Sequence, residues 1–359
     1  MKHSIPFGMI IVIVTLVSVP CARAQDSIRY LDRKSMKETT ASGSIQEESP
    51  SQITIKSGAA STTKEISALD VFDVVYDVPG AVKLTYRSAS SDERKAIEPA
   101  TKDTDRKKAL VDALKGYEEI VSKLEGGKYK FAERHLQYKV ARLLARQAED
   151  DPALTDRAIE ALEKFTKAYP EGWQISACTK LLARLQVAKG DTAAARKTYE
   201  ALAAVPNLPP SVRQECDLLA ADALIQGKQY AEAERKLQGL LGSIKPDDPQ
   251  ALRVRIYLAQ CQGASGKLAE AVKQLEGIIA TTTDKNLKAL AYNALGDSYR
   301  LQGRGKDALW PYLWVDVIYH QDREEHIKAM EHLAKLFEQQ GDAARAKEYR
   351  DLLKRETNK

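Results

Sequence analysis

One short motif in the sequence has the residue types of an acyl-transfer site. Ser61 and Lys64 have the Ser-x-x-Lys spacing in which a lysine amine activates a serine hydroxyl as a nucleophile. The Ser-Asp-Asn and Lys-Thr-Gly motifs that accompany this spacing in serine acyl-transfer enzymes do not follow it. Because the segment also lies between two predicted strands, we interpret it as a turn.

A second group, near the C-terminus, has the residue types of a metal site. His320, His326 and His332 lie close in sequence to Glu324 and Glu325. Two histidines that bind zinc from one helix are usually four residues apart, so that they share a face. His326 and His332 are six residues apart and fall on different faces of a predicted helix. The sequence also contains no glycine-rich phosphate loop, Cys-x-x-Cys pair or nucleophile elbow, so we predict no metal, no cofactor and no enzymatic activity.

Composition indicates what kind of elements fill the chain. Charged residues make up 29% of the 359 residues and aromatic residues only 6%, and Ala, Leu, Lys, Glu and Arg dominate after about residue 100. This balance is typical of amphipathic helices with much exposed surface. We therefore expect a mainly helical protein.

The N-terminus has the features of a secretory signal peptide. Lys2 precedes an apolar run from Met9 to Val19, and Ala22-Arg23-Ala24 provides a small-residue cleavage site before Gln25. We expect residues 1–24 to be removed on export to the periplasm or cell envelope, leaving no membrane-inserted segment; an uncleaved anchor is the alternative. Without Lys2 and Arg23, the 55 basic residues become 53 against 50 acidic ones, a balance that argues against nucleic-acid binding.

The cysteines of the exported chain do not form a disulfide framework. Cys178, Cys216 and Cys261 are an odd number with no closely spaced pair. All three fall in predicted helices, where a small apolar side chain suits tight packing. We expect them to be buried and unreactive.

Two regions differ in the period of their apolar residues. Residues 26–78 alternate apolar and polar side chains between turn residues, as at Ile53 and Ile55, which predicts four or five short strands. So many strands in so short a segment suggest a small SH3-like or Sm-like β-barrel. Residues 79–102 are interpreted as a linker or short helical hinge, and the helical period begins beyond them.

The C-terminal region repeats itself every 37 or 38 residues. Each unit has a glycine that we expect to end one helix in the left-handed conformation, and five or six residues later an alanine that lets the next helix pack closely. A second small residue, seven positions before each glycine, marks where the two helices cross. The three series are Gly190, Gly227, Gly266, Gly303 and Gly341; Ala158, Ala195, Ala233, Ala271, Ala308 and Ala346; and Ala183, Ala220, Ala259, Gly296 and Ala334.

The unit resembles the tetratricopeptide repeat, whose pattern is carried most fully by Tyr292, Leu295, Gly296, Tyr299, Gly303, Ala308 and Tyr312. The resemblance covers residues 103–356, with a leading half-repeat at 103–125 and then about six helix hairpins, although the period exceeds the usual 34 residues. It implies an α-solenoid after the small β domain. The whole chain resembles exported bacterial tetratricopeptide-repeat proteins with an N-terminal β domain, which generally act as adaptors and scaffolds.

A solenoid of this kind presents its first helices along a concave wall that binds segments of other proteins. Counting from the glycine and alanine anchors predicts a groove of mixed charge, without the lysine and asparagine set with which chaperone-binding members hold a C-terminal carboxylate. We therefore expect a non-enzymatic scaffold for a protein or peptide partner. The predicted groove residues are Lys180, Arg184, Asp217, Arg253, Ile256, Gln260, Asn293, Asp297, Arg300, Lys328, Glu331 and Lys335.

One aromatic-rich helix suggests a second surface. Trp310 and Trp314 are one turn apart and could face the convex side, whereas Tyr312 and Val315 occupy core positions of the repeat. Exposed aromatics mark protein contacts, although packing against the next repeat would explain them equally well. The same pair supports the alternative function, a glycan-binding or hydrolytic accessory protein of the cell envelope.

Overall fold

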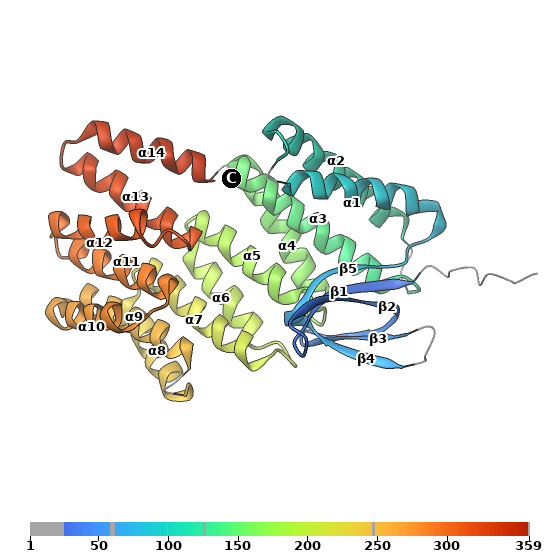
Figure 1. Cartoon of the computed structure of the whole chain (residues 1–359), viewed down its shortest axis with the longest axis horizontal. Coiled ribbons are helices and arrows are strands. Elements are labelled where there is room, and N and C mark those ends of the chain that lie inside the picture. The colour runs from blue at the N-terminus through green and yellow to red at the C-terminus, as the bar shows by residue number, and fades with distance from the viewer. Residues whose placement is uncertain (1–24, 58–61, 99, 125–126, 246–247, 358–359) are drawn as a thin grey trace, which may run out of the picture.

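The structure is a computed structural model, which describes residues 25–57, 62–98, 100–124, 127–245 and 248–357. A small sheet lies at one end, and helix hairpins stack away from it in a curved array (Figure 1). The predicted signal peptide and Ser61 lie outside the described residues. No helix in the described ranges is long and apolar enough to cross a membrane.

The N-terminal strands form an open antiparallel sheet, so the expectation of a closed barrel is wrong. The strand order is β4-β3-β2-β1-β5, and the two edge strands do not pair with each other. Helices, rather than further strands, cover the apolar face: Ile28, Ile53 and Val74 are at most 1% exposed and share one core with Leu136 of a helix. The strands are β1 (Asp26–Asp32), β2 (Lys37–Glu48), β3 (Gln52–Lys56), β4 (Thr63–Ser67) and β5 (Val71–Val75).

The region expected to be a linker contains helix α1, Lys83–Ile97, which packs along α2, Asp103–Lys123. Tyr86 and Ala89 are buried in this contact. A Cβ atom on Gly116 of α2 would lie 2.8 Å from the Ala89 Cβ, so the two helices cross very closely. The expected half-repeat is therefore the second helix of a complete hairpin.

Six further hairpins follow among the described residues. In each the second helix packs against its own first helix, and in all but the last it also packs against the first helix of the next hairpin. Figure 1 shows them stacked side by side. The helices are α3 (Lys130–Asp150), α4 (Thr155–Ala168), α5 (Ile175–Ala188), α6 (Thr192–Ala203), α7 (Pro210–Gln226), α8 (Tyr230–Ser243), α9 (Pro249–Ala264), α10 (Leu268–Thr281), α11 (Lys285–Leu301), α12 (Gly305–Val317), α13 (Arg323–Gln339) and α14 (Ala343–Thr357).

The turns within the hairpins confirm four of the five expected glycines. Gly190, Gly266, Gly303 and Gly341 have φ values between 73° and 91°. Gly227 instead has a φ of −76°, and Lys228 takes the left-handed conformation with a φ of 60°. The left-handed residue thus stands five positions before the packing alanine in all five turns, because α7 continues one residue further than its glycine suggests.

The small residues of the helix crossings are buried as expected. Ala183, Ala220 and Ala259 are 0% exposed. A Cβ on Gly296 would lie 2.6 Å from the ring of Tyr312, which belongs to the second helix of the same hairpin. These positions set how closely the two helices of each hairpin approach.

The cysteines Cys178, Cys216 and Cys261 are free and buried. Burial raises the pKa of the Cys216 and Cys261 thiols to about 12, which disfavours the reactive thiolate at neutral pH.

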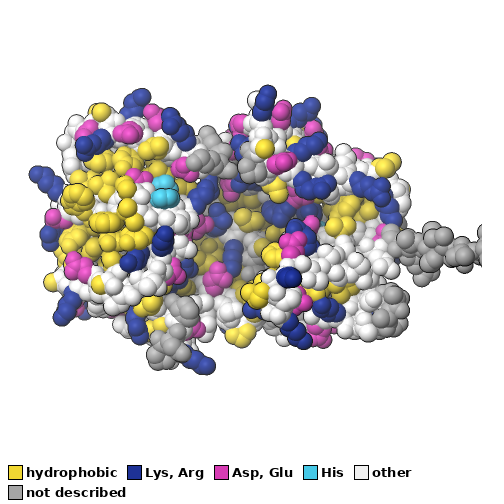
Figure 2. Space-filling view, viewed as in Figure 1, with side chains coloured by type: hydrophobic (Ala, Val, Ile, Leu, Met, Phe, Trp, Pro, Cys, Tyr) yellow, Lys and Arg dark blue, Asp and Glu magenta, His cyan; other side chains and the backbone are white. Residues whose placement is uncertain are grey.

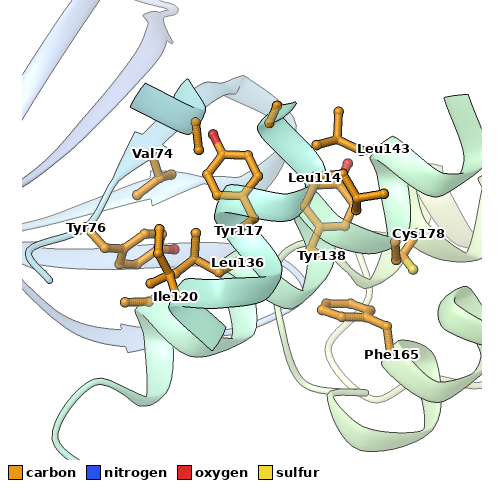
Figure 3. Packing of buried hydrophobic residues seen from close by; sticks show 14 of the residues in the cluster. Val74, Tyr76, Leu114, Tyr117, Ile120, Leu136, Tyr138, Leu143, Phe165 and Cys178 are labelled. Atoms are coloured by element: carbon orange, nitrogen blue, oxygen red, sulfur yellow. The ribbon is translucent and has the colours of Figure 1, made fainter. Parts of the chain in front are cut away.

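A continuous core joins the sheet to the first hairpins. Figure 3 shows Val74 and Tyr76 of the sheet region packed toward Ile120 and Leu136, with Phe165 and Cys178 further along the same cluster. Polar contacts reinforce it: the Tyr76 hydroxyl donates to Glu48 at 2.5 Å, and the Trp173 indole donates to the Tyr76 oxygen at 3.0 Å. The sheet is therefore fixed to the solenoid by shared packing.

Candidate functional site

Four first helices, α7, α9, α11 and α13, surround a hollow on the inner side of the solenoid. Its volume is about 640 Å³, and its lining is mostly charged or polar. Figure 2 shows a recess between the C-terminal hairpins and the middle of the molecule, with acidic and basic side chains in it. The hairpin stacking brings these side chains together from positions far apart in the chain.

Asp297 of α11 lies at the centre of the lining and is 4% exposed. The Tyr312 hydroxyl donates to Oδ1 at 2.7 Å, the Gln260 amide donates to Oδ2 at 2.8 Å, and Arg300 pairs with Oδ1 at 3.2 Å. Burial by itself would raise the pKa of Asp297, but Lys328, His332, the Tyr312 hydroxyl and Arg300 together hold it below its ordinary value. The carboxylate is therefore ionised and organises side chains from three hairpins.

Lys328 of α13 is the cation that several carboxylates share. Its Nζ lies 3.8 Å from Asp297 Oδ2. Burial lowers the pKa of Lys328, but the carboxylates of Glu325, Asp297 and Asp222 more than offset this and raise it. Burial also raises the pKa of both Asp222 and Glu325, although Lys328 opposes the shift. One lysine side chain thus interacts electrostatically with three carboxylates.

Asn293 of α11 supports the first turn of α13. It is 0% exposed, and its amide donates to the Glu325 carboxylate at 2.6 Å and to the Glu325 backbone carbonyl at 2.9 Å. Glu324, the preceding residue, lies 3.5 Å from Arg184 of α5. This contact links the third hairpin to the seventh, so the array curls far enough for these two hairpins to meet.

Most of the predicted groove residues meet at this inner face. Gln260, Asp297, Arg300, Lys328, Glu331 and Lys335 line the hollow. Arg184 and Asn293 contact residues that line it, and Arg253 acts on the Asp222 carboxylate. Lys180 lies outside the lining and pairs with Glu215 at 2.6 Å.

Besides Lys180, two predicted groove residues lie outside the lining. Asp217 pairs at 3.4 Å with Lys236 of α8, on the outer layer of helices. Ile256 is 0% exposed and belongs to the core.

The sequence analysis missed Asp222, Glu324, Glu325 and His332 as lining residues. Asp222 stands six residues before Lys228, the same offset from the left-handed residue that places Gln260, Asp297 and Lys335 in the lining. Counting six residues back from Gly227 gives Ala221 instead of Asp222. Counting from Lys228, the residue that is left-handed in the structure, gives Asp222.

The histidines proposed as metal ligands have separate partners. His326 Nε2 lies 2.9 Å from Asp316, whereas His332 Nε2 lies 3.3 Å from Asp297. No group of three potential ligands occurs in the described part of the chain.

The aromatic pair on α12 is on the surface. Trp310 is 70% exposed, and Trp314 is 44% exposed and stacks on Tyr292 at a ring distance of 5.9 Å. Val317 and Ile318 extend this face of the helix. Figure 2 shows hydrophobic side chains gathered over α12. These residues lie on α12, the second helix of its hairpin, and the convex aromatic patch stays a prediction.

Hairpins stacked around a polar inner face define an α-solenoid repeat protein. Residues 180–251 match the family model of the tetratricopeptide repeat. The fold is therefore a tetratricopeptide-like α-solenoid preceded by a small open sheet.

One solved structure supports the fold. A tetratricopeptide repeat protein from Parabacteroides merdae ATCC 43184 is 16% identical, with 76% of this chain and 98% of that chain covered and a TM-score of 0.50, and at this identity the similarity shows the fold alone. The apo form of RapI is 14% identical over 77% of this chain and 98% of that one, with a TM-score of 0.48. Among curated proteins, none matches this chain.

The His332 environment predicts a pH dependence of stability. Burial lowers the pKa of His332 to about 4, although Asp297 opposes the shift. Between about pH 6.5 and pH 4 the unfolded chain binds a proton that the folded protein does not, so His332 makes stability fall as the pH falls, by up to about 1.4 kcal/mol per pH unit. Urea unfolding across this range should show a shallower loss for His332→Gln than for the native chain, and identical slopes would contradict the assignment.

Proposed function

We propose that the solenoid is a non-enzymatic scaffold that holds a protein or peptide partner against its inner face. Tetratricopeptide repeats generally mediate protein–protein interaction, and residues 180–251 match such repeats. The observation that carries the proposal is the hollow of about 640 Å³, which four helices build together and which can admit side chains of another chain. The Asp297 network keeps its walls in place.

Site-specific photocrosslinking in the native cell tests this proposal. A benzophenone amino acid replaces Lys335, an exposed residue of the hollow, and in a matched control it replaces Glu276, an exposed residue of α10 on the outer layer. We expect a discrete protein adduct from position 335 and none from position 276. No adduct at position 335, or the same adduct at both positions, would contradict binding on the inner face.

We further propose that the scaffold works in the bacterial cell envelope. This rests on the basic, apolar and small-residue order of residues 1–24. Cell fractionation of the full-length chain should recover it in the periplasmic or envelope fraction with Gln25 as its first residue. Recovery in the cytoplasm with Met1 retained would reject export.

Trp310 supports a second candidate function, glycan binding by an accessory protein of the envelope. Its 70% exposed ring could stack on a sugar, whereas the neighbouring Trp314 ring is already stacked on Tyr292. Titration with cell-wall glycan fragments would then quench tryptophan fluorescence in the native chain and less so in Trp310→Ala.

A further inference from the structure

The hollow contains buried hydrogen-bond acceptors without donors. Gln260 is 4% exposed, and its amide nitrogen donates to Asp297. This contact fixes the side-chain orientation, because a carboxylate accepts and does not donate. Its other atom, Oε1, has no hydrogen-bond partner among the described residues. A buried polar atom left in this state costs free energy until a donor reaches it.

His332 adds a second acceptor to the same lining. Its Nε2 faces the Asp297 carboxylate at 3.3 Å, so this nitrogen carries the hydrogen in the neutral ring. Nδ1 then has a free lone pair, and no described residue donates to it. The Oδ1 atom of Asn293, beside Glu325, is also buried without a partner. Against these three acceptors the network leaves one buried donor unpartnered, Arg300 Nε.

The lining of the hollow holds five carboxylates, Asp222, Asp297, Glu324, Glu325 and Glu331, and four basic side chains, Lys228, Arg300, Lys328 and Lys335. Glu331 lies on the exposed part of this lining and forms no ion pair within the described residues. A ligand that brings donors and a positive charge would satisfy the acceptors and pair with Glu331. A C-terminal carboxylate would bring further acceptors and leave them unsatisfied.

We propose that the hollow is a specificity pocket for a basic side chain, a lysine or arginine of the bound peptide. The ammonium or guanidinium group pairs with Glu331 and Asp222 and donates to Gln260 Oε1 and His332 Nδ1. This deepens the scaffold function proposed above and rests on it. The hollow would therefore select a positively charged segment of a partner protein.

Calorimetric titration of the full exported chain with three synthetic peptides tests the proposal. The peptides have equal length and blocked ends, and alternate alanine with lysine, glutamine or glutamate. We expect the lysine peptide to bind at least about tenfold more tightly than the other two, with an affinity that falls as salt is added. Equal binding of the three, preference for glutamate, or no binding of the lysine peptide would overturn the proposal.

Matched variants test whether the lysine peptide binds in the hollow. Asp222→Asn and Glu331→Gln remove charge without changing size, and each is expected to weaken lysine-peptide binding by about tenfold. Glu276→Gln removes an equal charge from the outer layer and should leave binding unchanged. An equal loss in all three variants would mean that the peptide binds the general surface charge, which contradicts a pocket.

The crosslinking experiment separates the two proposals. An adduct from position 335 together with no preference for the lysine peptide rejects the basic-side-chain pocket and leaves the scaffold function standing. No adduct from that position rejects the scaffold function itself.

Discussion

Replacing Gly296 with alanine is expected to lower the free energy of unfolding by about 2 kcal/mol, because the new methyl group overlaps the Tyr312 ring. The added Cβ would lie 2.6 Å from Tyr312 Cζ. That ring cannot move aside easily, since it is 0% exposed, stacks on His332 at 4.8 Å and donates its hydroxyl to Asp297. Urea unfolding and hydrogen exchange of the α11 and α12 amides would measure the loss.

Gly277→Ala is the matched control. Gly277 lies within α10, and nothing stands within 4 Å of a Cβ added there. Alanine favours the helix more than glycine, so this variant should gain about 0.5–1 kcal/mol. A loss of stability at position 296 and a gain at position 277 would confirm that the close helix crossing, and not the removal of glycine itself, causes the loss. A gain in both variants would show that the crossing at Gly296 tolerates a side chain.

Asp297→Ala is expected to cost about 3–5 kcal/mol, since it removes the carboxylate that joins three hairpins. The variant leaves the Tyr312 hydroxyl, the Gln260 amide and the Lys328 ammonium without their common partner. Because the folded-state pKa of Asp297 is lowered, this stability is present above the unfolded pKa of about 3.9 and is lost as the pH falls through the folded pKa. The difference from the native chain should therefore persist at neutral pH and shrink only in acid.

Asp307→Ala provides the comparison on the surface. Asp307 pairs with Arg304 at 2.7 Å, and both side chains are about half exposed. Solvent screens such a pair, so its loss should cost no more than about 1 kcal/mol. Chemical denaturation of both variants at neutral pH would measure the contrast. Similar costs at the two positions would mean that the Asp297 network does not act as a buried junction.

The contacts that stabilise the inner face lie beside the proposed recognition site. Asp297 and Lys328 connect neighbouring hairpins, and the buried Gln260 Oε1 has no hydrogen-bond partner among the described residues. The contact between Arg184 and Glu324 shows how far the array curls. A partner bound here would touch several repeats at once, so binding should stabilise the curled form of the solenoid.

The spacing of small residues in the sequence was sufficient to predict the helix hairpins. Only glycine takes the left-handed turn without strain, and only glycine or alanine fits where two helices cross, so these local requirements appear directly as a period of 37 or 38 residues. The inward position of Gln260, Asp297 and Lys335 follows from the same register. The turn at Lys228 breaks the glycine spacing, because residues other than glycine can adopt the left-handed conformation at a modest cost in free energy.

The repeat period did not predict helix α1 or the open sheet, because both depend on contacts between residues far apart in the sequence. Helix α1 occupies a region whose serines weaken the helical pattern and which predicted a linker or short helical hinge. Its Glu93 accepts from the Lys139 ammonium at 2.7 Å and from the Tyr117 hydroxyl at 2.6 Å, and both partners lie in other helices. The strands gave no sign that helices would cover their apolar face and leave the sheet open.

The sequence by itself thus determined the hairpin and the residues that can turn toward the interior. The curl of the array, the depth of the hollow and the shortage of donors around Gln260 were decided only by tertiary structure. Local steric rules act within a few residues of the chain. The charges and hydrogen bonds of the hollow instead depend on side chains that the fold brings together from four hairpins.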